Sequence, residues 1–158
     1  MTIKITLDPQ AVNNLDLSAV RNQIEPLIKD TKLADYEQQL QFAIAYERKA
    51  DDPRELSEIP EIRLWYVRLD SVYPWLPFLL DWQTGELARY TAMLVPHQFN
   101  RSEGIIFNPE ALELFVMNKI FVLSDWLPQQ NIPSRSRLKS MAQLFGYELD
   151  DDFFGMLN

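Results

Sequence analysis

The sequence contains no cysteine, and this absence removes several kinds of site at once. Without thiols the fold has no disulfide bond, no thiolate metal site, no thiol nucleophile and no thiolate-held iron–sulfur cluster. Glycine is scarce as well, with four residues among 158, and their spacing cannot build either a GxGxxG or a GxxxxGK[ST] phosphate loop. Nucleotide binding through either loop is therefore excluded.

Positive charge and long apolar runs are also in short supply. Fifteen Lys and Arg against 23 Asp and Glu give a net charge of -8, so the field of the chain repels nucleic-acid phosphates and anionic membrane surfaces. The longest apolar-rich run, residues 105–127, is interrupted by charged residues such as Glu110, Lys119 and Asp125, which a bilayer core disfavours. We therefore expect no nucleic-acid partner and no membrane insertion. The first ten residues do not resemble a signal peptide, so we expect a cytoplasmic protein.

What remains is an ordinary globular composition, because hydrophobic residues make up 47% of the chain. A chain of this length fits a single globular domain over residues 1–158. Alternation of apolar and polar residues, or short apolar runs, predict strands over residues 2–7, 40–46 and 104–107. Apolar residues spaced at three and four predict helices over residues 18–30, 109–126 and 133–146. The first has Ser18 as its N-cap, the second starts at Pro109, and Gly146 stops the third. The acidic run Asp150 to Asp152 marks the start of a last short helix over 151–157, where it compensates the helix dipole.

The middle of the chain is harder to interpret. Residues 64–82, LWYVRLDSVYPWLPFLLDW, hold three of the four Trp. Residues 62–70 fit both a helical stripe and a buried strand, and we assign a strand because aromatic and β-branched residues are frequent there. Further strands are predicted over 78–82 and 87–95, joined by a hairpin loop, although 87–95 also fits a helix. An exposed loop should follow over 96–104. The sum is an α+β fold: one domain with an antiparallel sheet, helices packed on it and a helical C-terminal part.

His97 is the only histidine, and most simply it is a surface residue. A general base needs a positioned partner, and a metal ion needs several ligands. The carboxylates of Asp70, Asp81, Glu86 and Glu103 could meet His97 at the ends of neighbouring strands, where they would form an oxygen-rich site for a hard cation. This arrangement is the basis of an alternative function, a small metal-dependent or His-based hydrolase.

Two other features suit the binding of a partner protein. Arg135, Arg137 and Lys139 form the one basic cluster of an acidic chain, and such a cluster attracts acidic partners, although a solvated helix face is the simpler interpretation. Trp75 lies between two prolines on a predicted turn, and a partly exposed Trp on a rigid turn is a good interface anchor. With His97, these residues are the predicted partner-binding set. No catalytic, metal-binding or cofactor-binding residue is predicted.

Four long segments carry a resemblance to a known family. They read DDPRELSEIPEIRLWYVRLD, YPWLPFLLDWQTGELARYTAMLVPHQF, GIIFNPEALELFVMNKIFVLSDWL and IPSRSRLKSMAQLFGYELDD. These segments resemble the chlororespiratory reduction 6 family of cyanobacteria and chloroplasts, and the likeness covers nearly the whole chain.

The resemblance implies a non-enzymatic assembly factor for the photosynthetic NADH dehydrogenase-like complex. Its partner would be the ferredoxin-like iron–sulfur subunit I of that complex. The chain resembles a cyanobacterial member acting in the cytoplasm, whereas plant relatives act in the plastid stroma. The family supplies no functional residues to carry over, so the predicted binding set rests on residue chemistry alone.

Overall fold

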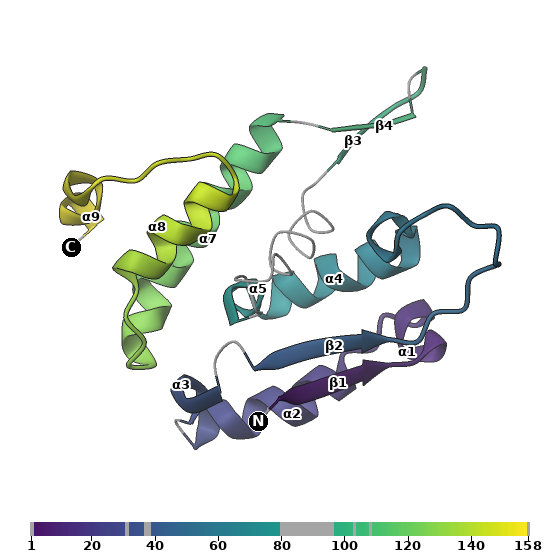
Figure 1. Ribbon diagram of the computed structural model, residues 1–158, viewed down its shortest axis with the longest axis horizontal. Coiled ribbons are helices and arrows are strands. Elements are labelled where there is room, and N and C mark those ends of the chain that lie inside the picture. Colours follow the sequence, from purple (N-terminus) through teal and green to yellow (C-terminus); the bar gives the residue numbers. More distant parts are fainter. Residues whose placement is uncertain are drawn as a thin grey trace. The chain divides into compact units, whose positions relative to one another are not determined.

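A computed structural model of the protein describes residues 2–30, 32–36, 39–79, 97–102, 104–107 and 109–157. The chain divides into two compact units, Met1–Leu94 and Val95–Asn158, and Figure 1 labels the helices and strands of each. The prediction of one globular domain over residues 1–158 stays a prediction.

The first unit begins with two strands joined by helices. Strand β1 (Ile3–Leu7) and strand β2 (Leu40–Ile44) are connected through α1 (Pro9–Asn13), α2 (Ser18–Lys29) and α3 (Leu33–Tyr36). Both strands were predicted correctly, but they pair in parallel along their whole length, so the prediction of an antiparallel sheet is wrong for this pair. The helical crossover returns the chain to the end of the sheet where β1 began, and β2 then runs in the same direction.

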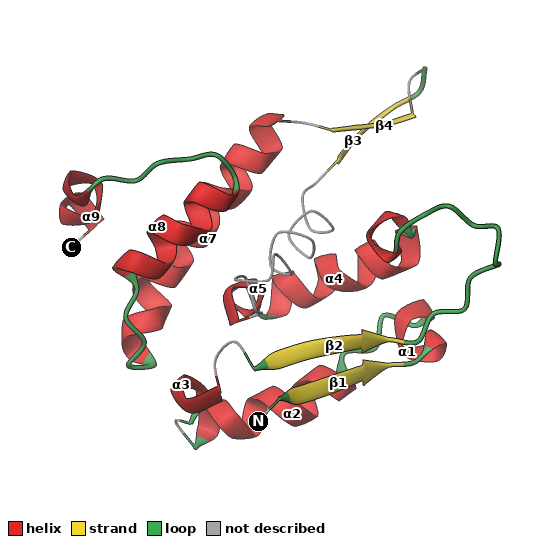
Figure 2. Ribbon diagram, viewed as in Figure 1, coloured by secondary structure: helices red, strands yellow, loops and turns green. Residues whose placement is uncertain are grey.

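One face of this sheet is buried and the other is open. The side chains of Lys4 and Thr6 on β1 are exposed, as expected for a strand with one solvated face. The partner positions in the parallel register place the apolar side chains of both strands on the opposite face. Its buried members are Ile5, Leu7, Leu40 and Phe42. Figure 2 shows α4 running alongside the two strands.

Helix α2 has the predicted extent, but its N-cap differs from the predicted one. The N-cap is Leu17, and Ser18 is the first helical residue, whose backbone N–H donates to the Asp16 carboxylate at 2.9 Å. No side-chain hydrogen bond caps the helix at Leu17, so the cap expected from Ser18 is not made. Pro26 lies inside the helix, which nevertheless continues to Lys29. The missing N–H of Pro26 leaves a gap in the ladder of backbone hydrogen bonds.

A short 3₁₀ turn (Leu56–Glu58) leads into α4 (Pro60–Val72) and the single turn α5 (Leu76–Leu79). The strand predicted over residues 62–70 is therefore wrong. Pro60 stands in the first turn of α4, a position where proline favours a helix start because no intrahelical partner is lost. The buried residues of the helix follow helical spacing, and they are Ile62, Trp65, Tyr66 and Leu69.

The other predictions for the middle of the chain have mixed outcomes. Residues 78–79 belong to α5 rather than to the strand predicted over 78–82. The remainder of that strand, the hairpin loop at 83–86 and the element at 87–95 lie outside the described residues.

Three aromatic rings form the centre of the first unit. Phe42 of β2 lies edge-to-face against Trp65 and Tyr66 of α4, with ring centroids 5.9 and 5.5 Å away, and the rings of Trp65 and Tyr66 are 5.0 Å apart. Edge-to-face contacts at this range are favourable. The indole N–H of Trp65 donates to the backbone carbonyl of Asp16 at 2.8 Å. Trp65 thus joins β2, α4 and the segment before α2.

The second unit starts with an antiparallel hairpin. Strands β3 (His97–Asn100) and β4 (Gly104–Phe107) pair with His97 opposite Phe107. The prediction of β4 is confirmed. The loop predicted over 96–104 is wrong for 97–100, because pairing with β4 supplies hydrogen bonds that no local pattern in this polar segment indicates.

Helices complete the second unit: α7 (Pro109–Gln129), α8 (Arg135–Leu144) and α9 (Asp151–Leu157). The predicted helical C-terminal part is confirmed, although α7 extends through Pro128 instead of ending before it. Figure 1 shows α8 running back alongside α7, with α9 reached through an extended loop. Gly146 follows α8 with a φ of +83°, a conformation that favours glycine at a helix end. No helix within the described ranges combines the length and apolar character needed to span a bilayer.

The apolar side of α7 includes a lysine. Lys119 is only 3% exposed, and its ammonium lies 5.0 Å from the ring centroid of Phe115. An ammonium over a ring face is attracted by the π electrons, while the aliphatic stem packs as an apolar side chain. Lys119 therefore shares helical spacing with the apolar residues of α7 and is buried as they are.

Candidate functional site

The basic cluster lies on α8, where the structure divides it. Leu138, Met141 and Ala142 form the buried side of this helix. Residues four positions apart share a helix face, whereas residues two apart do not. Arg135 and Lys139 therefore lie on one face, which we call the α8 basic face, and Arg137 lies on another side of the helix.

The α8 basic face is paired with the C-terminal helix. The ammonium of Lys139 donates to the Asp151 carboxylate at 2.7 Å. Through this hydrogen bond and its charge, Lys139 lowers the pKa of the Asp151 carboxyl below its ordinary value, and Arg135 adds a weaker electrostatic effect in the same direction. The side chain of Lys139 is 34% exposed and that of Asp151 is 73% exposed. The ion pair is therefore a surface contact that solvent screens.

An aromatic ring from α9 lies against the same two cations. The ring centroid of Phe154 is 5.5 Å from the Arg135 guanidinium carbon and 6.0 Å from the Lys139 ammonium, and Phe154 is buried. Such distances suit cation–π attraction. Asp151 and Phe154 are three residues apart, so one face of α9 presents both a carboxylate and a phenyl ring.

The sequence contains a local reason for α9 to form here. The Asp150 carboxylate accepts the backbone N–H of Phe153 at 2.8 Å, which is the hydrogen bond of an N-cap. Asp151 and Asp152 follow in the first turn, where negative charge offsets the helix dipole. This acidic start was correctly predicted. What sequence analysis missed is that Asp151 also faces a cation twelve residues earlier.

Trp75 does not occupy the exposed position that its prediction assumed. It is 7% exposed, and its ring lies edge-to-face with Tyr73 at 5.5 Å. The backbone N–H of Leu76 donates to the Tyr73 carbonyl at 3.0 Å, so the chain folds back on itself at this point. The expected exposure of Trp75 is wrong, and we do not retain it as an interface anchor.

The residues of the hydrolase alternative are distributed over different elements. Asp70 lies within helix α4 of the first unit, not at the end of a strand. The backbone of His97 lies in β3 of the second unit, while its side chain is outside the described part, as are Asp81, Glu86 and Glu103. Among the described residues, no group of three or more His, Cys, Asp or Glu is placed to hold a metal ion. The hydrolase alternative placed Asp70 at the end of a strand, and in the structure Asp70 lies inside a helix.

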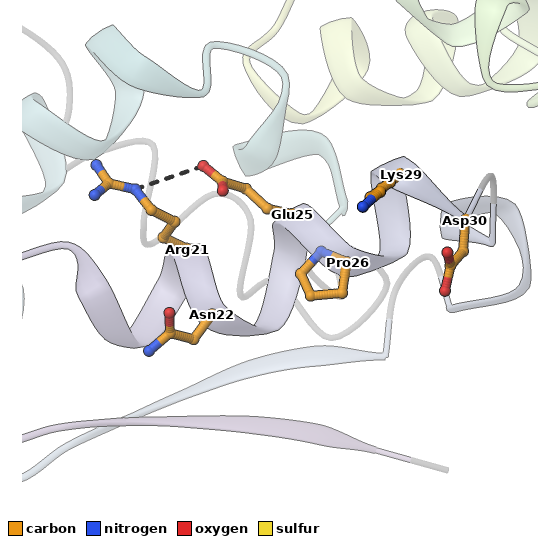
Figure 3. A pocket seen from close by; sticks show the side chains of 6 residues that line it. All are labelled: Arg21, Asn22, Glu25, Pro26, Lys29 and Asp30. Atoms are coloured by element: carbon orange, nitrogen blue, oxygen red, sulfur yellow. Dashed lines mark ion pairs between the residues drawn. The ribbon is translucent and has the colours of Figure 1, made fainter.

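A shallow surface hollow of about 500 Å³ lies along α2. Figure 3 shows an ion pair between two of the lining residues, in which Arg21 Nε is 3.5 Å from Glu25 Oε1. The Tyr73 hydroxyl donates to the same carboxylate at 3.2 Å, and burial raises the pKa of Tyr73 above its ordinary value. The full lining is Arg21, Asn22, Glu25, Pro26, Lys29 and Asp30. Both signs of charge alternate along one open helix face, so this hollow presents no field that would select one class of ligand.

Comparison with known proteins identifies a family. Residues 7–156 match the model of the family described as chlororespiratory reduction 6, which leaves out six residues at the start of the chain and two at its end. The resemblance carried by the four sequence segments is thereby confirmed. No solved structure matches the chain.

Proposed function

The chain belongs to the chlororespiratory reduction 6 family, and we propose that it is a non-enzymatic assembly factor that acts on the iron–sulfur subunit I of the photosynthetic NADH dehydrogenase-like complex. The family points to a role in the biogenesis of this complex. The choice of subunit I as client, and of the cytoplasm as the place of action, belongs to the proposal. The observation that carries it is the family match over residues 7–156.

The chemistry of the chain supports binding of a client. Ferredoxin-like subunits hold their clusters through cysteine thiolates, and a chain without cysteine has no thiolate with which to take a cluster from its client. We therefore propose that it holds or escorts the subunit. The α8 basic face offers cations in a surface contact, which suits a reversible interaction with an acidic partner.

Co-purification tests this proposal. The full-length chain carrying an affinity tag is isolated from cells that assemble the complex, and the captured material is analysed for subunit I and for bound iron. We expect capture of subunit I by the wild-type chain. Failure to capture it under conditions that preserve transient complexes, for example after brief cross-linking, would exclude subunit I as the client.

A charge-reversal variant tests the predicted binding residues. In the triple variant Arg135→Glu, Arg137→Glu and Lys139→Glu we expect weaker capture, because the acidic chain then repels an acidic client. The melting temperature should change little, since surface charges contribute little to stability. A variant with Arg101→Glu, an exposed residue in the turn after β3, serves as the control for a change of charge elsewhere on the second unit. If the triple variant captures subunit I at the wild-type level, the basic cluster is not the binding site for the client.

A further inference from the structure

We propose that α9 is a built-in ligand of the α8 basic face, and that an acidic–aromatic segment of a partner protein binds this face by displacing α9. This inference rests on the proposed function only in taking subunit I as the partner protein. The segment that would bind is a helical stretch with Asp or Glu in its first turn and an aromatic residue three positions later. Asp151 and Phe154 have this spacing in α9 itself.

The chemistry of the contact indicates what the face recognises. Lys139 takes a carboxylate at 2.7 Å, and Arg135 and Lys139 both lie within cation–π range of one phenyl ring. The carboxylate and the ring come from the same face of a single helix, so the two cations bind them together. Any helix that repeats this pair of groups satisfies the same contacts. Since the rest of the chain is acidic overall, such a helix is attracted to this face and repelled elsewhere.

The attachment of α9 is suited to exchange. It is a helix of seven residues, and helices of this length are not stable in water without tertiary contacts. Phe154 is its one buried residue, whereas Met156 is 78% exposed. The carboxylate of Asp151 adds an ion pair that is open to solvent. Elements held by few buried contacts open at low free-energy cost.

Displacement predicts a competition that can be measured. While α9 is docked, its own carboxylate and ring occupy the face. Only molecules with α9 released can bind an external helix, so the apparent affinity equals the intrinsic affinity multiplied by the fraction of released molecules. A substitution that releases α9 but leaves both cations should therefore strengthen binding of the external helix. A substitution that releases α9 by removing a cation should weaken it. These opposite outcomes separate displacement from a purely structural role of the contact.

The test uses full-length variants and a labelled peptide with the sequence of residues 147–158, YELDDDFFGMLN, as the external helix. Asp151→Lys breaks the ion pair and keeps both cations, and we expect it to bind the peptide roughly two- to fivefold more tightly than the wild type. Phe154→Ala releases α9 without changing any charge and should also bind more tightly. Lys139→Glu should bind more weakly than the wild type. Binding is measured by fluorescence anisotropy.

Controls address charge and peptide specificity. Arg101→Glu makes the same charge change as Lys139→Glu at an exposed turn residue, and it should leave peptide affinity at the wild-type value. A peptide with the changes Asp151→Lys and Phe154→Ala should not bind. Hydrogen exchange of the α9 amides reports release directly, and we expect faster exchange in Asp151→Lys, Phe154→Ala and Lys139→Glu.

Two outcomes would overturn displacement. If Asp151→Lys and Phe154→Ala show faster exchange in α9 but no tighter peptide binding, the face serves only to anchor α9. If exchange in α9 is unchanged in both variants, these contacts do not hold the helix.

Capture of subunit I separates this inference from the proposed function. If tighter peptide binding is observed while the wild-type chain captures no subunit I, displacement stands and the proposed client is wrong. If the wild-type chain captures subunit I and Asp151→Lys captures no more of it, the client stands and its binding by displacement is refuted.

Discussion

Replacement of Trp65 by Phe should destabilise the protein more than truncation of an exposed side chain of α4. Trp65 is fully buried, contacts the rings of Phe42 and Tyr66 and donates its indole N–H to the Asp16 carbonyl. A phenyl ring keeps part of the aromatic contact but has no N–H donor. It also leaves unfilled the volume that the second ring of the indole occupies.

The expected cost has two parts. Loss of the hydrogen bond, with a partly buried carbonyl left unpaired, contributes about 1 kcal/mol. The smaller side chain and the void beside it contribute about 1–2 kcal/mol. Together they lower the free energy of unfolding by about 2–3 kcal/mol. This is a large share of the roughly 5–15 kcal/mol by which a domain is typically stable. Trp65→Ala should cost about 3–5 kcal/mol.

Urea unfolding followed by far-ultraviolet circular dichroism measures this difference. The neighbouring residue Leu64 provides a matched control, because it lies on the same helix and is 58% exposed. Leu64→Ala should change the free energy of unfolding by less than about 0.5 kcal/mol. If Trp65→Phe proves as mild as Leu64→Ala, the aromatic cluster does not hold β2 against α4.

Two further predictions concern titratable groups. Because Lys139 lowers the pKa of Asp151 below its ordinary value of 3.8, the Asp151 charge should stabilise docking of α9 above that pH, and this contribution should disappear as the pH falls through the lowered pKa. The amide resonance of Gly155 reports docking, and Lys139→Met should weaken the pH dependence, with the remainder due to Arg135. The pKa of Tyr73 is raised above its ordinary value of 10.0, so its neutral form favours folding, and stability should decrease as the pH rises above that value. Tyr73→Phe should remove this decrease and, by deleting the hydrogen bond to Glu25, cost about 0.5–1 kcal/mol at neutral pH; an unchanged alkaline slope in urea titrations of Tyr73→Phe would contradict the assignment.

Local patterns in the sequence determined much of the secondary structure. Alternation identified β1 and β2, because a strand with one buried face must alternate. The spacing of apolar residues identified α7 and α8, and the acidic run before Phe153 identified α9. Pro109 and Gly146 marked a helix start and a helix end, since each restricts or permits backbone angles within its own few residues. These signals act over one or two helical turns, so a sequence shows them directly.

Tertiary structure decided whatever depends on distant partners. The direction of β2 relative to β1 follows from the helices that connect them, and alternation is the same for either direction. By composition, residues 62–70 suit a strand or a helix equally well. Tertiary packing favours the helix, in which two buried side chains contact the ring of Phe42 in β2. Trp75 is buried because the chain folds back beside Tyr73. Arg135 and Lys139 appear in the sequence as a basic cluster, but only the position of α9 shows that a carboxylate and a phenyl ring already occupy them. Composition and periodicity report the needs of each segment, whereas pairing and burial depend on which segments meet in space.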